Sequence, residues 1–264
     1  MIQIDSPQNP RLKEIAKLRD RKHRDATGLF IIEESRVIKR ALKKGWAPET
    51  VCWCSEKMIA SDRKILSDLR EFACDQLELT ERAMSKIAYR NKPGGFLVIA
   101  KQKFIELADL QLPDSPLIVV LDNVEKPGNL GAVLRSASGS GVDAVLISDN
   151  GTDLFNPNTL RSSTGAFFEI PIVQCNPEEL REYLKTNNIE ITATTPDTDI
   201  VYTDIDMTKG IALVMGAEDV GLDINWLNSA DTKVRIPMAG VADSLNVSVS
   251  SALMMYEARR QRTK

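Results

Sequence analysis

A polar pair, Ser244 and Asn246, stands at the start of a segment that should form a helix, SLNVSVSSALMMYEARRQR (residues 244–262). Five apolar residues recur there at the spacing of one helix face, which predicts that this face packs on the core: Leu245, Val249, Ala252, Leu253 and Tyr256. The polar pair can cap the free N–H groups of the first helical turn. Alternatively, it lines a site in which the positive helix end holds a phosphate or carboxylate. The neighbouring loops have to decide between these interpretations.

A second group of chemically useful residues follows the apolar run at residues 117–121. Gly128 and Gly131 bracket Asn129, which lets backbone N–H groups face a ligand, and Arg135 lies six residues further along the expected helix. Taken alone, this spacing is also that of an ordinary strand-to-helix turn with a surface arginine. It matches neither the Rossmann G-x-G-x-x-G pattern nor a P-loop, because no Gly-Lys-Ser/Thr follows.

The elements that must position these loops are a series of nearly continuous apolar runs. The runs are LIVVL, AVLIS, IEITAT, IALVM and KVRIPM. Runs of this kind are typical of parallel strands buried on both faces, and ligands of a parallel sheet bind beyond the carboxyl ends of its strands. The run IALVM is followed by a second glycine-containing loop, GAEDVGL, in which Glu218 either caps the next helix or belongs to a site.

Residues 1–104 are predicted to form a smaller α/β domain. Its helices are expected near residues 9–21, 34–44, 62–72 and 81–87, and its strands near residues 28–33, 50–54, 76–79 and 94–100. The polar stretch LADLQLPDSP (residues 107–116), with two prolines, predicts a linker at residues 105–115, and residues 116–264 are predicted to form the second domain.

The net charge of −3 is unevenly distributed along the chain. Residues 1–112 hold 22 lysines and arginines against 16 acidic residues, and the remainder holds 12 against 21. Seven cations crowd one short segment: Arg11, Lys13, Lys17, Arg19, Arg21, Lys22 and Arg24. Such a run is either a solvated helix face or a surface that binds the phosphate backbone of a nucleic acid.

Composition excludes several classes of protein. No run of eighteen apolar residues and no signal-peptide pattern is present, so we expect a cytoplasmic protein with no membrane partner. The four cysteines lack C-x-x-C spacing, which favours reduced thiols over disulfides or zinc. The single histidine, His23, argues against a multi-histidine metal site and against a Ser-His-Asp hydrolase. We therefore expect no metal.

Three loops taken together carry a specific resemblance. The segments NVEKPGNLGAVLRSA, LVMGAEDVGL and IPMAGVADSLNVSVSSALMMYEARRQR resemble, in this order, the three motifs of the SpoU/TrmH-type RNA 2′-O-ribose methyltransferases of the SPOUT superfamily. The likeness extends from about residue 116 to residue 262 and includes LRSSTGAFFEIPI. Residues 6–42 also resemble the N-terminal substrate-binding module of that family, a ribosomal-protein-like α/β unit, although Glu34 stands where glycine is common.

The resemblance implies a fold, a cofactor and an assembly. It implies a deep trefoil knot in the C-terminal domain and a homodimer whose active site lies at the interface, with the catalytic arginine supplied across it. S-adenosylmethionine would be bound in the knot by the loops around Gly216, Ile236 and Leu245, with Thr194 and Thr195 on the adjoining loop.

The same resemblance implies which residues do the chemistry. The residues that match the polar positions of the three motifs are Asn129, Arg135, Glu218, Ser244 and Asn246. Methyl transfer from a sulfonium needs the ribose hydroxyl held in line and deprotonated, so positioning should supply much of the rate. Because a guanidinium stays protonated at neutral pH, we expect Arg135 to clamp phosphate and hydroxyl rather than to act as a base.

Two functions other than rRNA ribose methylation remain open from the sequence. One is a methyltransferase-like protein that binds RNA without turnover. The sequence argues against it, because such a protein has no chemical reason to keep the five polar residues together. A tRNA ribose methyltransferase is the other, and ribosomal RNA is favoured over it because the chain carries a separate N-terminal module. Base methylation is disfavoured, since the resemblance is to the ribose-modifying branch.

Overall fold

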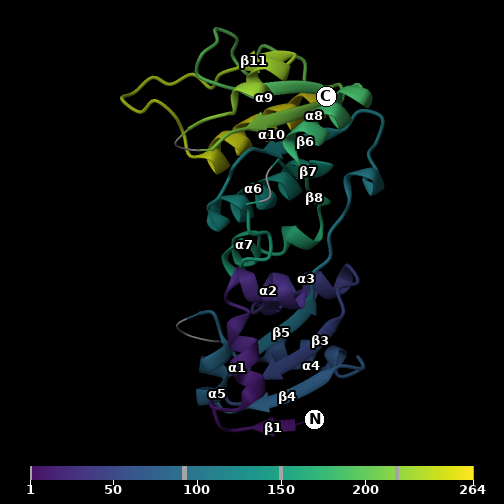
Figure 1. The fold of residues 1–264 in the computed structure, drawn as a ribbon, viewed down its shortest axis with the longest axis vertical. Helices are drawn as coiled ribbons and strands as arrows, with labels where there is room; N and C mark the ends of the chain where they lie inside the picture. The colour runs from purple at the N-terminus through teal and green to yellow at the C-terminus, as the bar shows by residue number, and fades with distance from the viewer. Residues whose placement is uncertain (1, 91–93, 149–150, 218–219, 264) are drawn as a thin grey trace. The chain divides into compact units, whose positions relative to one another are not determined.

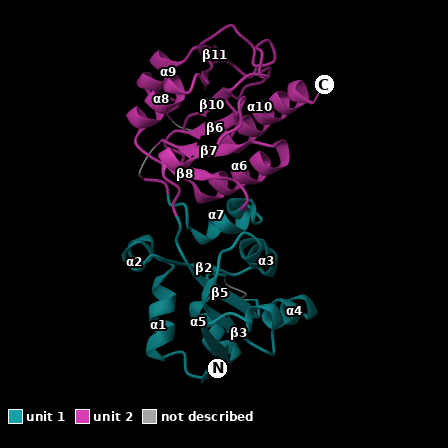
Figure 2. Cartoon of the chain, turned by 90° about the vertical axis from the view of Figure 1, so that its right-hand side faces the viewer, with its two compact units in different colours: residues 1–103, 153–168 teal, residues 104–152, 169–264 magenta. Residues whose placement is uncertain are grey.

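The computed structural model describes residues 2–90, 94–148, 151–217 and 220–263. The chain folds into two compact units, coloured separately in Figure 2. Unit 1 comprises residues 1–103 and 153–168, and unit 2 comprises residues 104–152 and 169–264. The first unit thus includes a segment from the part of the sequence predicted to form the second domain.

Unit 1 is built on a mixed five-stranded sheet in the order β1-β4-β3-β5-β2 (Figure 1). Its strands are β1 Ile2–Ile4, β2 Leu29–Ile32, β3 Pro48–Trp53, β4 Asp75–Leu79 and β5 Phe96–Lys101. Its helices are α1 Pro10–Lys17, α2 Arg21–Thr27, α3 Ser35–Lys43, α4 Ala60–Leu69, α5 Glu81–Ile87 and α7 Pro157–Ser162, with the 3-10 turn Ala166–Phe168. Strand β5 runs antiparallel to β2 and β3, whereas β1–β4 and β3–β4 are parallel pairs.

Two expectations for unit 1 need correction. The single helix predicted over residues 9–21 is two helices, because Leu18 ends α1 and the side chain of Asp20 caps α2 by accepting the N–H of Lys22 at 3.0 Å. Strand β1 was not predicted, since three residues are too few for a periodic pattern. Glu34, at the N-cap of α3, has φ −99°, an ordinary extended conformation that needs no glycine.

The segment 153–168 is held in unit 1 by aromatic packing. Phe155 lies 4.7 Å from Phe30 between ring centroids, and Phe168 lies 5.2 Å from Trp46. Phe167 packs edge-on against Phe155 at 5.3 Å. Each such pair stabilises by about 0.5–1.5 kcal/mol beyond the area that it buries, so the cluster fixes the segment firmly.

Unit 2 contains a six-stranded sheet in the order β11-β9-β10-β6-β7-β8, in which every pair is parallel, as predicted. Its strands are β6 Leu117–Leu121, β7 Ala144–Ile147, β8 Ile172–Gln174, β9 Glu190–Thr194, β10 Ile211–Met215 and β11 Thr232–Val234. Its helices are α6 Pro127–Ser140, α8 Pro177–Thr186, α9 Ile224–Ser229 and α10 Val247–Arg262. Figure 2 shows α8 and α9 on one side of the sheet and α6 and α10 on the other. The short strand β8 was not predicted.

The residues 105–115 take part in the core of unit 2. The 3-10 turn Leu107–Asp109 lies in this stretch, and both Leu107 and Leu110 are buried among the core residues of the unit. The stretch that was predicted to be a linker therefore contains two buried apolar residues.

Helix α10 forms where it was predicted, but the opposite set of residues is buried. Its core face carries Val247, Ser251, Met254, Met255 and Ala258, which have the same spacing as the predicted stripe shifted by two positions. In the predicted stripe, Val249 is 47% exposed, Leu253 37% and Tyr256 51%. The helix is thus apolar on two faces, and in the single chain one of them is left open.

No helix in the described part of the chain has both the length and the apolar character that a membrane span requires.

Candidate functional site

A pocket of about 430 Å³ lies in unit 2 where β9, β10 and β11 end. The walls include six residues that the sequence assigned to a site: Thr194, Thr195, Gly216, Ile236, Ser244 and Leu245. These residues come from three separate segments, which follow β9, β10 and β11 and which the parallel sheet brings to one edge. The pocket therefore assembles all five predicted cofactor residues and one of the predicted catalytic residues.

One wall of the pocket is the loop between β10 and α9. Gly221 adopts a left-handed φ of +72°, and its N–H donates to the carbonyl of Ala217 at 3.1 Å, which holds these two pocket-lining residues close together. A Cβ on Gly216 would lie 2.5 Å from the backbone nitrogen of Leu222. Glycine is therefore required at position 216 by the loop itself, and not only by an incoming ligand. Glu218, predicted to be catalytic, lies outside the described residues.

Two of the predicted catalytic residues meet beside the pocket. Asn246 directly follows Leu245, and its Nδ2 donates to Oδ1 of Asn129 at 3.3 Å. Asn246 is also the N-cap of α10, since its Oδ1 accepts the N–H of Ser248 at 3.0 Å. The capping interpretation is thus correct for Asn246, while Ser244 is exposed and lines the pocket.

Arg135 lies on α6 and does not line the pocket. Its side chain is exposed, and it has no hydrogen-bond or ion-pair partner among the residues that the structure describes. Gly139, four residues further on, shares its helix face and abuts the hydroxyl of Tyr256, which would lie 2.7 Å from a Cβ there. Arg135 therefore lies on the side of α6 that borders the exposed stripe of α10.

Several pocket residues were missed by the sequence reasoning. Asp197, Arg235 and Asp243 line the pocket, and Nε of Arg235 is buried without a hydrogen-bond partner in the described chain. They lie in or next to the quoted loops, but a single sequence does not distinguish a pocket-facing charge from a solvated one. Val220, 77% exposed, also lines the pocket.

The basic segment of unit 1 is mostly at the surface, with one exception. Lys13 and Lys22 are exposed, Lys17 pairs with Glu14 at 2.8 Å, and Arg21 pairs with Asp25 at 3.4 Å. The remaining two exposed arginines also have partners within unit 1, because Arg11 pairs with the carboxylate of Asp75 and Arg19 donates to the carbonyls of Lys86 and Ala88.

Arg24 corrects the predicted RNA-binding set. It is fully buried, it forms an ion pair with Asp153, and its Nη1 donates to the carbonyls of Leu18 and Arg19 at 2.9 Å. The guanidinium of Arg24 is therefore paired in the interior of unit 1 and cannot contact a nucleic acid.

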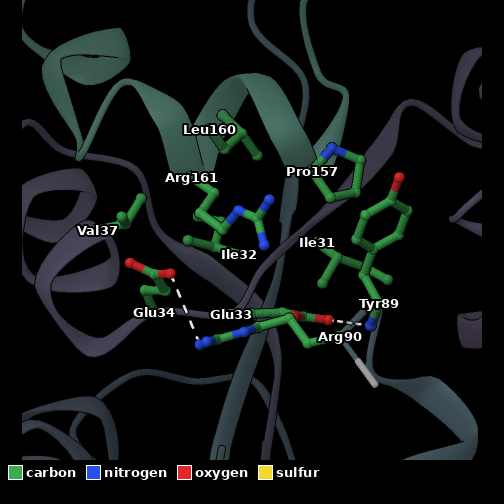
Figure 3. A pocket seen from close by; sticks show the side chains of 10 residues that line it. All are labelled: Ile31, Ile32, Glu33, Glu34, Val37, Tyr89, Arg90, Pro157, Leu160 and Arg161. Atoms are coloured by element: carbon green, nitrogen blue, oxygen red, sulfur yellow. Dashed lines mark hydrogen bonds and ion pairs between the residues drawn. The ribbon is translucent and has the colours of Figure 1, made fainter. Parts of the chain in front are cut away.

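A second pocket, of about 20 Å³, lies in unit 1 between β2, α3 and α7 (Figure 3). The Glu33 carboxylate accepts the N–H of Tyr89, and burial raises the pKa of this carboxyl. Arg90 lies 3.7 Å from the carboxylate of Glu34, and Arg161 points over the same pocket. A space of this size holds roughly one water molecule, so we do not assign a substrate to it. No cluster of metal-ligating side chains is found within the described ranges.

Two family models and a relative of known name match this chain. Residues 116–256 match the model of the SpoU rRNA Methylase family, and residues 9–98 match the MRM3-like substrate binding domain. The chain is 32% identical to the 23S rRNA (guanosine(2553)-2′-O)-methyltransferase RlmP of Bacillus subtilis, over 98% of this chain and 100% of that protein.

Solved structures match over nearly the whole chain. The crystal structure of an RNA 2′-O ribose methyltransferase is similar with a TM-score of 0.89 and 39% identity, covering 99% of this chain and 100% of that one. An AdoMet-bound rRNA methyltransferase from Sinorhizobium meliloti has a TM-score of 0.90 and 31% identity, with 98% of both chains covered. The pocket, the paired asparagines and these matches lead to one conclusion: the chain belongs to the SpoU rRNA methylase family.

Proposed function

We propose that this protein is an S-adenosylmethionine-dependent methyltransferase that modifies a ribose 2′-hydroxyl of ribosomal RNA. The observation that carries the proposal is the pocket in which Thr194, Thr195, Gly216, Ile236 and Leu245 meet, next to the Asn129–Asn246 pair. Relatives that match nearly the whole chain are named as rRNA methyltransferases, and one solved relative contains AdoMet. Because rRNA is the proposed substrate, we also propose that the protein acts in the cytoplasm.

The pocket suits S-adenosylmethionine in size and in lining. Its volume of about 430 Å³ lies within the range of roughly 300–1,000 Å³ that is typical of small-molecule sites. Apolar side chains such as Leu245 and Ile236 suit an adenine ring, and Asp197, Asp243 and Arg235 provide charges for a zwitterionic amino-acid end. When bound, S-adenosylmethionine supplies the methyl group as a sulfonium substituent.

The residues of this chain supply position and charge. We propose that Asn129, Asn246 and Ser244 hold the target nucleotide beside the pocket. Arg135, whose planar guanidinium can grip two groups at once, then clamps the phosphate and the ribose hydroxyl. Since an arginine does not act as a base at neutral pH, the proton of the hydroxyl passes to another acceptor. Glu218 stays a predicted member of this set.

We further propose a knotted homodimer, as the sequence resemblance implies. The support for the dimer is the open apolar face of α10, formed by Val249, Leu253 and Tyr256. An exposed apolar stripe of this kind is typical of a protein interface. If a second copy of the chain covers this stripe, Arg135 lies at the edge of the interface and next to that second copy, because Arg135 is on the adjoining side of α6.

The proposal is tested by mapping 2′-O-methylated nucleosides with mass spectrometry in RNA from cells with and without the protein. We expect one ribose methylation to disappear from ribosomal RNA and to return when purified protein and S-adenosylmethionine are added to the unmodified RNA. A loss confined to transfer RNA would support the second substrate class, and no change in either RNA would support binding without turnover.

The exposed lysines of the basic segment are expected to contribute to RNA binding. Replacing Lys13 and Lys22 by alanine should weaken RNA binding and reduce the slope of log K against log salt by roughly one per lost phosphate contact. The measurement is a salt titration of RNA affinity. The matched control replaces Arg63 and Lys64, two exposed cations of α4 in the same unit. Equal slopes for both double variants would show that the segment is only a solvated face.

A further inference from the structure

Asp122 is a buried carboxylate at the carboxyl end of β6. It is 1% exposed, and it does not line the pocket. Its Oδ1 accepts the hydroxyl of Ser148 at 2.6 Å and Nε1 of Trp226 at 3.2 Å, while its Oδ2 accepts the N–H of Asp223 at 3.3 Å. These donors are all neutral groups: a hydroxyl, an indole N–H and a backbone N–H. Removing a carboxylate from water without a cation is costly, so the arrangement calls for an explanation.

The three donors belong to separate elements of unit 2. Ser148 directly follows β7, Asp223 is the N-cap of α9, and Trp226 is a fully buried residue of α9. Asp122 thus joins the carboxyl ends of two neighbouring strands to the helix that follows a third strand, β10.

The backbone of Asp122 adds a fourth contact, at the end of the loop 216–222 opposite to Asp223. Its N–H donates to the carbonyl of Met215 at 2.9 Å, and Met215 is the last residue before the loop 216–222. Asp223, held by the carboxylate, is the first residue after that loop. Asp122 therefore holds both ends of the loop whose residues Gly216 and Leu222 line the pocket.

We propose that Asp122 is a positioning residue for cofactor binding, which holds the described parts of this loop, residues 216–217 and 220–222, where they form the pocket wall. The inference rests on the proposed function, because it takes the pocket to be the S-adenosylmethionine site. It assigns to the carboxylate a role in affinity for the cofactor, separate from its contribution to the stability of the fold. Sites of this kind lose affinity when their supporting hydrogen bonds are removed, even though the ligand-contacting residues are intact.

The test is Asp122→Asn, which keeps the size of the side chain. The amide oxygen can still accept from Ser148 or Trp226, but the amide NH₂ then faces the N–H of Asp223, so that the hold on the end of the loop is lost. We expect the Kd for S-adenosylmethionine, measured by calorimetry, to rise roughly tenfold or more, since a buried donor loses its partner. The KM for S-adenosylmethionine should rise by a similar factor, with a smaller change in kcat and an unchanged Kd for RNA.

The matched control is Asp143→Asn, at the other end of the same strand pair. Oδ2 of Asp143 accepts the N–H of Leu117 at 2.8 Å, so this carboxylate fastens the amino end of β6, away from the pocket. Its replacement should lower the melting temperature without altering the affinity for S-adenosylmethionine. If Asp122→Asn lowers the melting temperature but binds S-adenosylmethionine as the wild type does, Asp122 is structural only and the proposal is wrong.

A milder variant keeps the test decisive if Asp122→Asn does not fold. Trp226→Phe removes one donor to the carboxylate and retains an aromatic ring in the core, and we expect it to raise the Kd severalfold. A folded Trp226→Phe protein with unchanged affinity would then overturn the proposal. A wild-type protein that shows no binding of S-adenosylmethionine would instead refute the proposed function, so the two failures are distinguishable.

Discussion

Replacing Arg135 by alanine is expected to lower methyl transfer by orders of magnitude while leaving the affinity for S-adenosylmethionine nearly unchanged. Arg135 lies outside the pocket, and its exposed guanidinium has no partner among the described residues that the substitution would disturb. Removing one donor that stabilises a transition state costs roughly 10²- to 10³-fold in kcat. An interaction made only in the transition state lowers kcat and kcat/KM together, and single-turnover kinetics measure this directly.

Two further variants sharpen this test. Arg135→Lys should recover little activity, because a point charge does not replace a planar group that grips phosphate and hydroxyl together. Lys185→Ala, which removes an exposed cation near the end of α8 in the same unit, should leave the rate unchanged. Full activity of Arg135→Ala, or a defect that appears only in KM for S-adenosylmethionine, would remove Arg135 from the proposed chemistry.

Blocking the pocket is expected to have the second large effect. Leu245→Trp places a bulky ring in the wall of a pocket of about 430 Å³ and should abolish binding of S-adenosylmethionine by calorimetry. Leu245→Met is the matched control, because it conserves volume and should bind nearly as the wild type does. Gly216→Val is unsuitable for this purpose, since a side chain there meets the backbone of Leu222 even without a ligand. Wild-type affinity of Leu245→Trp would place the cofactor elsewhere.

Mixing the two inactive proteins tests whether Arg135 acts across a dimer interface. In a hybrid dimer, the Arg135→Ala chain keeps an open pocket and the Leu245→Trp chain keeps its arginine. If the arginine serves the partner's pocket, random mixing should restore roughly a quarter of the wild-type activity, because half of the dimers are hybrids with one intact site each. No recovery despite demonstrated subunit exchange would place Arg135 and the pocket in the same chain.

The elements that were predicted correctly depend on local pattern. The five apolar runs of the second half become β6, β7, β9, β10 and β11, and the helix at the C-terminus begins at the predicted polar pair. Such runs and caps are readable because side-chain periodicity and N-cap chemistry act over a few residues. The order of the three glycine-containing loops was enough to identify the family, because chance agreement at all three is remote.

The features that were missed depend on contacts between distant residues. Helix α10 carries two apolar faces with the same spacing, and only the position of the sheet decides that Met254 and Met255 are buried while Leu253 is not. Arg24 looked like its basic neighbours, yet an acidic residue more than a hundred positions away, Asp153, takes it into the interior of unit 1.

The sequence by itself determined most of the elements and the parallel character of the sheet of unit 2, because these follow from local propensity and side-chain periodicity. It also determined that the loops converge at one edge, because ligands bind at the carboxyl ends of parallel strands. The tertiary structure alone decided which charges are free, which helix face is open, and that Asp122 holds both ends of the loop 216–222. Burial and hydrogen bonding are properties of pairs of groups, and for these residues the partner lies far away in the chain.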